Sequence, residues 1–178
     1  MITVSTDGSC LRNPGGAIGW AWANHDGSSA SGGHASGTNQ VAELMAVLEA
    51  IRAHPGDQPL VIQADSLYAI KCSSEWVAGW KRKGWRTAGG GPVQNLALIQ
   101  SIEAAIAARP GGVSFVWVRG HQGDHFNERA DELAGIAARS VRDDAPVPAV
   151  ATEAAPDRVR DGVPTPAVAV QPAPDVLF

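Results

Sequence analysis

The chain is poor in cysteine and carries no excess of positive charge. Cys10 and Cys72 are its only cysteines among 178 residues, too few and too far apart for a disulfide-stapled scaffold or a cysteine metal site. Free thiols in a reducing cytosol fit this pattern. The formal net charge of -4 excludes a uniformly basic nucleic-acid binder, so any affinity for phosphate must come from a local cluster of cations.

Long apolar runs are also missing. No segment approaches the roughly 20 apolar residues of a membrane span, and the amino terminus lacks a basic segment followed by an apolar core. We therefore expect a cytoplasmic protein without membrane contact. With 44% hydrophobic residues, the chain can form one well-packed domain and hardly two.

Proline is distributed unevenly. Residues 142–178 hold seven of the twelve prolines and no aromatic residue before Phe178. Such a segment cannot bury enough apolar surface to offset the entropy of ordering. We expect a domain over residues 1–141 and a disordered Pro/Ala-rich tail or linker over residues 142–178.

Residues 2–7 alternate in polarity, and the last of them is Asp7. This period indicates a strand with one face more apolar than the other, and it places Asp7 at or near the carboxyl end of that strand. Taken alone, Asp7-Gly8 would favour a simple hairpin turn. A chemical role gains weight because Glu43, Asp65 and Asp131 each occur where a fold could bring them beside Asp7.

The next segments predict a meander of strands followed by a helix. Residues 18–23 and, more weakly, 28–37 continue an antiparallel series. Residues 41–51 are helix formers, with Thr38 or Asn39 as N-cap. This helix is apolar nearly all round and hence buried, so Glu43 within it is a candidate for a role away from solvent.

The second half alternates strands with helices. The apolar run 60–65 is typical of a central parallel strand, and Asp65 stands at its carboxyl end, the edge at which α/β sheets bind ligands. Ser66 can cap the next helix. A helix over 93–108, a strand over 113–118 and a helix over about 127–140 complete an α/β pattern.

Seven short motifs occur along residues 1–140, and together, in this order, they resemble type I ribonuclease H. They are Thr6-Asp7-Gly8-Ser9-Cys10 with Asn13-Pro14-Gly15-Gly16, Ala42-Glu43-Leu44, Ala64-Asp65-Ser66, Trp80-Lys81-Arg82-Lys83-Gly84-Trp85, Gly120-His121 and Asn127-Glu128-Arg129-Ala130-Asp131-Glu132-Leu133-Ala134. The resemblance implies a ribonuclease H-like fold: a five-stranded mixed sheet, three strands antiparallel and two parallel, flanked by helices.

The resemblance implies an endonuclease that cuts the RNA strand of RNA–DNA hybrids and leaves 5′-phosphate and 3′-hydroxyl ends. Its carboxylates, Asp7, Glu43, Asp65 and Asp131, would bind two Mg²⁺ or Mn²⁺ ions. Physical chemistry agrees, because converging carboxylates repel one another unless cations neutralise them, and hard divalent ions prefer oxygen ligands. A metal pair about 3.5 to 4 Å apart can activate water and stabilise the leaving oxygen.

His121 resembles a loop histidine that assists proton transfer or product departure; the alternative is a surface histidine between glycines. Two other functions remain open. One is a catalytically weak hybrid-binding module, which the four carboxylates disfavour. The other is a nuclease or transposase of the same fold, which the tryptophan-rich basic segment disfavours.

The segment 81–86 holds four cations and resembles a protrusion that grips the DNA strand of a hybrid, although a solvated turn is the simpler interpretation. The residues expected to contact the hybrid are Cys10, Asn13, Asn39, Gln40, Trp76, Trp80, Lys81, Arg82, Lys83, Trp85, Arg86 and Asn127. The loop after Asn13 is shorter than in many relatives, and Leu67 replaces a frequently polar residue.

The chain closes with Val176-Leu177-Phe178 after a proline-rich arm. Such an end resembles peptides that dock on replication proteins such as sliding clamps, and proline-rich arms act as semi-rigid spacers. The alternative is a linker to a further domain. We otherwise expect a monomer.

Overall fold

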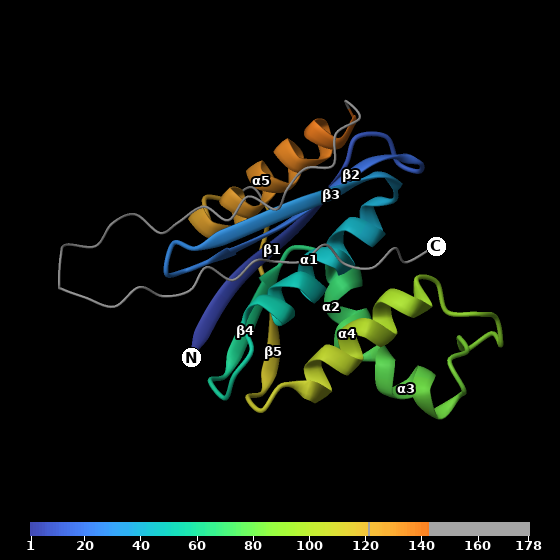
Figure 1. Ribbon diagram of the computed structural model, residues 1–178. Helices are drawn as coiled ribbons and strands as arrows, with labels where there is room; N and C mark the ends of the chain where they lie inside the picture. Colours follow the sequence, from blue (N-terminus) through green and yellow to red (C-terminus); the bar gives the residue numbers. More distant parts are fainter. Residues whose placement is uncertain (121, 143–178) are drawn as a thin grey trace.

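The computed structural model describes residues 1–120 and 122–142 (Figure 1). Five strands and five helices occur in these ranges. In chain order they are β1 (Ile2–Cys10), β2 (Gly16–Asn24), β3 (Ser29–Gly37), α1 (Asn39–Ala53), β4 (Leu60–Ala64), α2 (Leu67–Ser73), α3 (Trp76–Arg82), α4 (Leu96–Ala108), β5 (Val113–Trp117) and α5 (His125–Arg142).

The five strands form one mixed sheet in the order β3-β2-β1-β4-β5. β1 and β3 run antiparallel to β2, whereas β4 runs parallel to both β1 and β5. Short loops suffice for the antiparallel part, while the parallel strands require crossovers, which the helices between β3 and β5 provide. The predicted ribonuclease H-like sheet, three strands antiparallel and two parallel, is confirmed.

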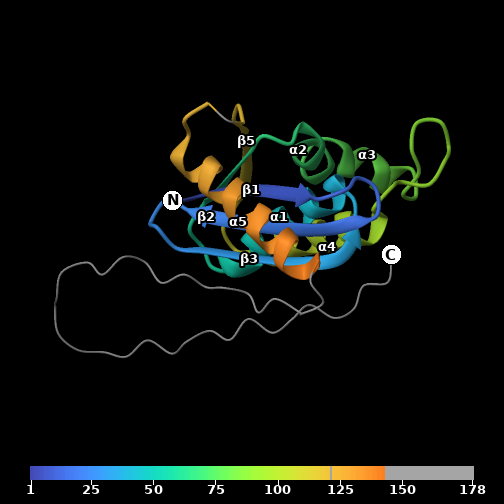
Figure 2. The same cartoon turned by 90° about the horizontal axis from the view of Figure 1, so that it is seen from above.

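The sheet is covered by helices on both faces (Figures 1 and 2). α1 packs on one face, with α4 behind it, and α5 packs across β1, β2 and β3 on the other. The largest core cluster lies between the sheet and α1, around Val4, Leu44 and Ile62, each fully buried. β1 is covered on both faces, and Ser5 and Asp7 are therefore buried as well as Val4.

Two helix starts follow the predicted capping residues. The Thr38 hydroxyl accepts a hydrogen bond from Val41 N (3.2 Å) at the start of α1. The Ser66 hydroxyl accepts one from Ala69 N (3.3 Å) at the start of α2. Each bond satisfies a backbone donor that has no partner within its helix.

Two other helices depart from the predicted bounds. α4 begins at Leu96 and not at residue 93, because Asn95 adopts a left-handed conformation with φ 53° that a helix cannot include. α5 begins at His125, two residues early, because the Asp124 carboxylate accepts hydrogen bonds from Phe126 N and Asn127 N, 3.1 Å each. α5 also continues to Arg142, a residue predicted to belong to the tail.

His121, the predicted tail beyond residue 142 and its end Val176-Leu177-Phe178 lie outside the described residues. Within residues 1–120 and 122–142, no helix has the length and apolar character needed to cross a bilayer.

Candidate active site

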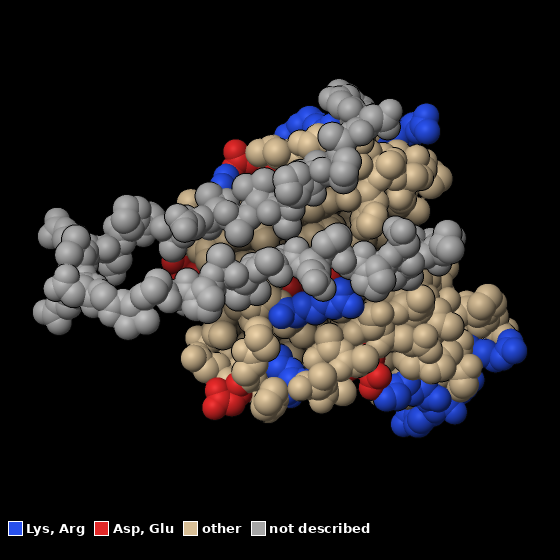
Figure 3. All heavy atoms as spheres, viewed as in Figure 1, with Lys and Arg blue, Asp and Glu red and all other residues tan. Residues whose placement is uncertain are grey.

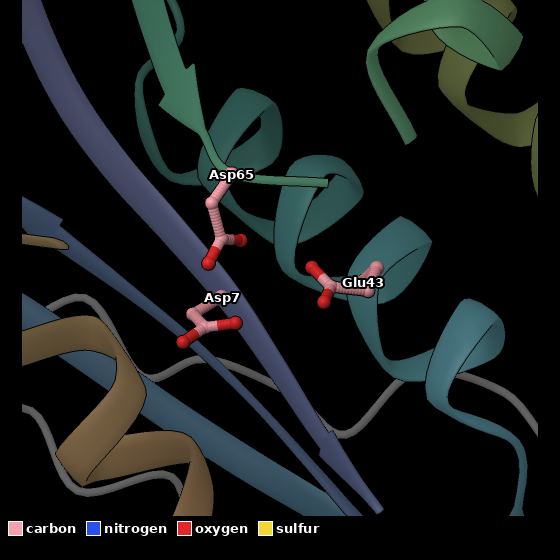
Figure 4. Close-up of side chains that lie close together, drawn as sticks. All are labelled: Asp7, Glu43 and Asp65. Carbon is pink, nitrogen blue, oxygen red and sulfur yellow. The ribbon is translucent and has the colours of Figure 1, made fainter. Parts of the chain in front are cut away.

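Three acidic side chains from different segments converge at one edge of the sheet. Asp7 comes from β1, Glu43 from α1 and Asp65 from the residue that follows β4. One carboxylate oxygen of each lies within 4.8 Å of the other two, and the three side chains point toward one another (Figure 4). Asp7 is 6% exposed and Glu43 7%, whereas Asp65 is half-buried, so two of the three carboxylates are largely desolvated.

The register of two parallel strands brings the aspartates together. The pairing of β1 with β4 ends at Thr6 and Ala64, so Asp7 and Asp65 are the next residues along adjacent strands. β1 continues to Cys10, paired from there only with β2. The prediction that Asp7 stands at or near the end of its strand is therefore refined: Asp7 stands where the parallel part of β1 ends.

Glu43 reaches the same place because α1 lies very close to β1. A Cβ atom added at Gly8 would lie 2.3 Å from Glu43 N, well inside contact distance. Only glycine permits this approach without displacement of a backbone. Asn39 lies one helical turn before Glu43, and its side-chain amide donates to Glu43 Oε1 (3.4 Å).

Mutual repulsion and burial change the proton affinity of these groups. Burial, followed by the charge of Asp65, raises the pKa of Asp7 to about 8, against the partial compensation of the Gly8 N–H that donates to Asp7 Oδ1 (2.7 Å). Burial, followed by the charges of Asp7 and Asp65, raises the pKa of Glu43 well above its usual range. The carboxylates of such a cluster resist ionisation together, and a bound cation would favour their charged forms.

Asp131 faces the same cluster from α5. Its charge and a hydrogen bond with Asp7 contribute to the raised pKa of Asp7. The other three predicted carboxylates are thus neighbours of Asp7, although the four come from four separate segments. His121, the remaining predicted catalytic residue, lies outside the described part of the chain.

The predicted basic segment lies on and after α3. Lys and Arg side chains gather over α3 at the lower right of the molecule (Figure 3). Lys81 is held by Glu103 of α4 (Nζ to Oε1, 2.5 Å), and Arg86 donates to the Gly90 carbonyl (2.9 Å). Arg82 and Lys83 are exposed.

The tryptophans of this region contact one another and their neighbours. The rings of Trp76 and Trp80 lie 5.6 Å apart, and Trp76 also meets the edge of Tyr68 at 6.4 Å. Trp85 takes a left-handed conformation with φ 61° and donates its backbone N–H to the Trp80 carbonyl (2.7 Å). The basic segment 81–86 therefore follows, and in part contains, a group of mutually contacting aromatic residues.

A second group of predicted contact residues lies near the start of α1. The Asn13 side-chain oxygen accepts from Asn39 N (3.3 Å) and ties the β1–β2 loop to the helix. Gln40 is exposed and Cys10 half-buried. Asn127 differs, because it is only 1% exposed and its side chain does not reach the surface. A contact of Asn127 with the hybrid stays a prediction, and this burial disfavours it.

Two contacts of Asp65 were not predicted from the sequence. The Trp117 indole N–H donates to the Asp65 carbonyl (3.0 Å), and the backbone of Gly120 lies against the Asp65 carboxylate. The sequence contains the motif Gly120-His121 and predicts the strand 113–118, but it links neither of them to Asp65.

Comparisons with known proteins agree with this architecture. The RNase H family model matches residues 1–139. The ribonuclease H of Anaeromyxobacter dehalogenans (strain 2CP-C) is 42% identical over 146 residues, which cover 76% of this chain and 79% of that protein. The ribonuclease H of Bordetella bronchiseptica is 42% identical over 145 residues, which cover 80% of this chain and 92% of that protein.

Solved structures show the same fold. LC9-RNase H1, a type 1 RNase H with the type 2 active-site motif, superposes with a TM-score of 0.66 at 30% identity over 78% of this chain and 72% of that one. A foamy viral protease-reverse transcriptase in complex with dsDNA gives a TM-score of 0.64 at 21% identity over 78% of this chain and 94% of that one, a likeness of fold alone. From the family model and the relatives together, this chain belongs to the ribonuclease H family and is a ribonuclease.

Proposed function

We propose that the protein is an endonuclease that hydrolyses the RNA strand of RNA–DNA hybrids with the help of two divalent cations, leaving 5′-phosphate and 3′-hydroxyl ends. The observation that carries this proposal is the convergence of Asp7, Glu43 and Asp65, with Asp131 beside Asp7, in a chain of the ribonuclease H family.

The donor set fits Mg²⁺ or Mn²⁺. It consists of carboxylate oxygens, which hard divalent cations prefer. Burial and mutual repulsion raise the pKa of both Asp7 and Glu43, and a bound cation would relieve that repulsion. When bound, a metal pair supplies activation of water and stabilisation of the leaving oxygen.

The chain's own contribution is to hold these oxygens in place and to bind the hybrid beside them. Asp7 and Asp65 are fixed by the β1–β4 ladder, and Glu43 by the close contact of α1 with β1. We assign His121, which follows β5 and precedes α5 in the sequence, the role of assisting proton transfer or product departure.

Two regions are suited to the two strands of a hybrid. The exposed cations Arg82 and Lys83 provide charge for the phosphates of the DNA strand. The loop at Asn13, tied to the start of α1 at Asn39, presents the amide and backbone groups that suit detection of 2′-hydroxyls. The protein would thereby distinguish a hybrid from duplex DNA.

The test compares labelled hybrid, duplex DNA and duplex RNA in the presence of Mg²⁺. We expect cleavage of the RNA strand of the hybrid alone, and end analysis should give 5′-phosphates. An inactive hybrid-binding module would bind without cleavage. A nuclease or transposase of the same fold would cut duplex DNA as well.

A matched pair of variants tests the site. Asp65→Asn keeps the size of the side chain and removes a charged ligand, so cleavage should collapse while hybrid binding survives. Asp57→Asn makes the same chemical change at an exposed position in the loop before β4 and should leave cleavage unchanged. Near-normal turnover of Asp65→Asn would remove Asp65 from the metal ligands.

We further propose that the end Val176-Leu177-Phe178 contacts a replication protein. A proline-rich arm before it would act as a spacer, and tethering would raise the local concentration of the nuclease at hybrids. Deletion of residues 171–178 should abolish binding to the sliding clamp or to the single-strand-binding protein and leave cleavage of free hybrid intact. If neither protein binds the full chain, the segment is a linker. Cytoplasmic location and a monomeric state stay predictions.

A further inference from the structure

The carbonyl group of Asp65 lies beyond the end of the β4–β5 ladder. The last backbone hydrogen bond of this ladder joins Val118 N to the Ala64 carbonyl (3.0 Å). The next carbonyl, that of Asp65, accepts instead from the indole N–H of Trp117 (3.0 Å). A side chain thus extends the strand's hydrogen bonding by one residue, to the residue that bears a carboxylate of the cluster.

Burial does not explain this tryptophan. Trp117 is 50% exposed, and it does not belong to either core cluster. Its defined contact is the indole hydrogen bond to the backbone of Asp65. Removal of that donor therefore probes the position of Asp65 more than the stability of the fold.

Gly120 restrains the other end of the same residue. A Cβ atom added at Gly120 would lie 2.4 Å from Asp65 Oδ2 and 3.3 Å from its Cγ. Gly120 is not among the glycines with positive φ, so its φ does not require glycine. Glycine is needed at this position because the carboxylate occupies the space of a side chain.

We propose that Trp117 and Gly120 are positioning residues for Asp65, one fixing its backbone and the other forming the wall against which its carboxylate rests. This inference rests on the proposed function, in which Asp65 is a metal ligand. Groups that orient a metal ligand without touching the metal typically alter metal affinity about 10- to 100-fold when removed. Trp117 acts through the backbone, so we expect the lower end of that range.

The experiment titrates the full chain with Mn²⁺ alone by isothermal calorimetry. Trp117→Phe keeps an aromatic ring and removes the N–H donor, and it should weaken Mn²⁺ binding about tenfold. Val116→Ala alters the exposed neighbour on the same strand, 43% exposed, and should bind Mn²⁺ like the wild type. The melting temperature in EDTA should be equal for the two variants.

Glycine variants form a second pair. Gly120→Ala should displace the Asp65 carboxylate, because the added Cβ overlaps it, and should weaken Mn²⁺ binding by at least as much as Trp117→Phe. Gly112→Ala lies at the other end of β5, where an added Cβ meets nothing within 4 Å, and should have no effect. In cleavage assays the two site variants should need more Mn²⁺ for half-maximal rate, recover kcat at saturating Mn²⁺ and keep the wild-type KM for the hybrid.

The outcomes separate this inference from the proposed function. A wild-type chain that binds no Mn²⁺ overturns the metal role on which both rest. A wild-type chain that binds Mn²⁺, with Trp117→Phe and Gly120→Ala binding it equally well, overturns the positioning role alone. A raised KM for hybrid with unchanged Mn²⁺ affinity makes Trp117 a substrate contact and also overturns it.

Discussion

The replacement of Gly8 by alanine tests how far the candidate site depends on the contact between β1 and α1. The added Cβ would lie 2.3 Å from Glu43 N and 2.5 Å from the Ala42 carbonyl carbon. Both are backbone atoms, so no change of side-chain rotamer relieves the overlap. The strand and the helix must separate, and they carry Asp7 and Glu43 apart.

The size of the effect follows from the geometry. Ordinary van der Waals contact begins at 3.4 Å, so α1 must retreat by about 1 Å, a displacement that can cost about 100-fold in rate when it misplaces a reacting group. Overpacking of this kind lowers the free energy of unfolding by about 1 to 3 kcal/mol, or the Tm by roughly 3 to 10 °C. Cleavage should therefore fall about 100-fold at temperatures at which the variant is still folded.

The assay measures hybrid cleavage at saturating Mg²⁺, well below the Tm of the variant, together with the Tm in EDTA. Gly112→Ala is the control, because its added Cβ meets nothing within 4 Å. A Gly8→Ala variant with normal rate and normal Tm would refute the packing argument. A variant with lowered Tm and normal rate would leave the packing argument intact and show that the separation of Asp7 from Glu43 is uncritical.

Three further predictions concern charge. The pKa of Asp7 is about 8 in the fold against 3.8 ordinarily, so at neutral pH the folded state retains a proton that the unfolded state loses. The Tm in EDTA should therefore fall as the pH rises from about 6.5, the ordinary pKa of histidine, to 8. Mg²⁺ should reverse this fall, and an equal fall in Asp7→Asn would exclude Asp7 as its source. Glu103→Gln should release Lys81 from its ion pair, so hybrid binding measured by fluorescence anisotropy should tighten. The slope of the logarithm of the binding constant against the logarithm of salt concentration should steepen by at most about 0.9. An unchanged slope would show that Lys81 does not reach a phosphate. Arg109 is buried and donates to carbonyls of the α1–β4 and α4–β5 loops. Arg109→Met should therefore lower the free energy of unfolding in urea by about 3 kcal/mol or more and leave the metal requirement of cleavage unchanged. A decrease of less than about 1 kcal/mol would mean that water replaces the guanidinium.

Much of the fold could be predicted because its signals are local. The caps at Thr38 and Ser66 need only a hydroxyl before a helix-forming run. The meeting of Asp7 and Asp65 follows from a rule about the carboxyl ends of parallel strands. The start of α4 could not be predicted, since it depends on the left-handed conformation of Asn95, which asparagine tolerates without requiring it.

Contacts between distant segments were harder to anticipate. The bond from Trp117 to Asp65 depends on the register of β4 against β5, and a shift by one residue would reverse the face on which the indole lies. The burial of Asn127 likewise depends on the packing of the whole start of α5, so an amide predicted to touch substrate lies inside the protein.

The origin of Asp131 on α5 has a consequence for the protein during its synthesis. Three carboxylates are present once β4 has left the ribosome, but α5 is the last of the described elements, and it packs across β1, β2 and β3. A nascent or proteolysed chain that ends before α5 exposes a face of its sheet and lacks the fourth carboxylate. The docking of α5 therefore covers this face of the sheet and completes the set of four carboxylates in one step.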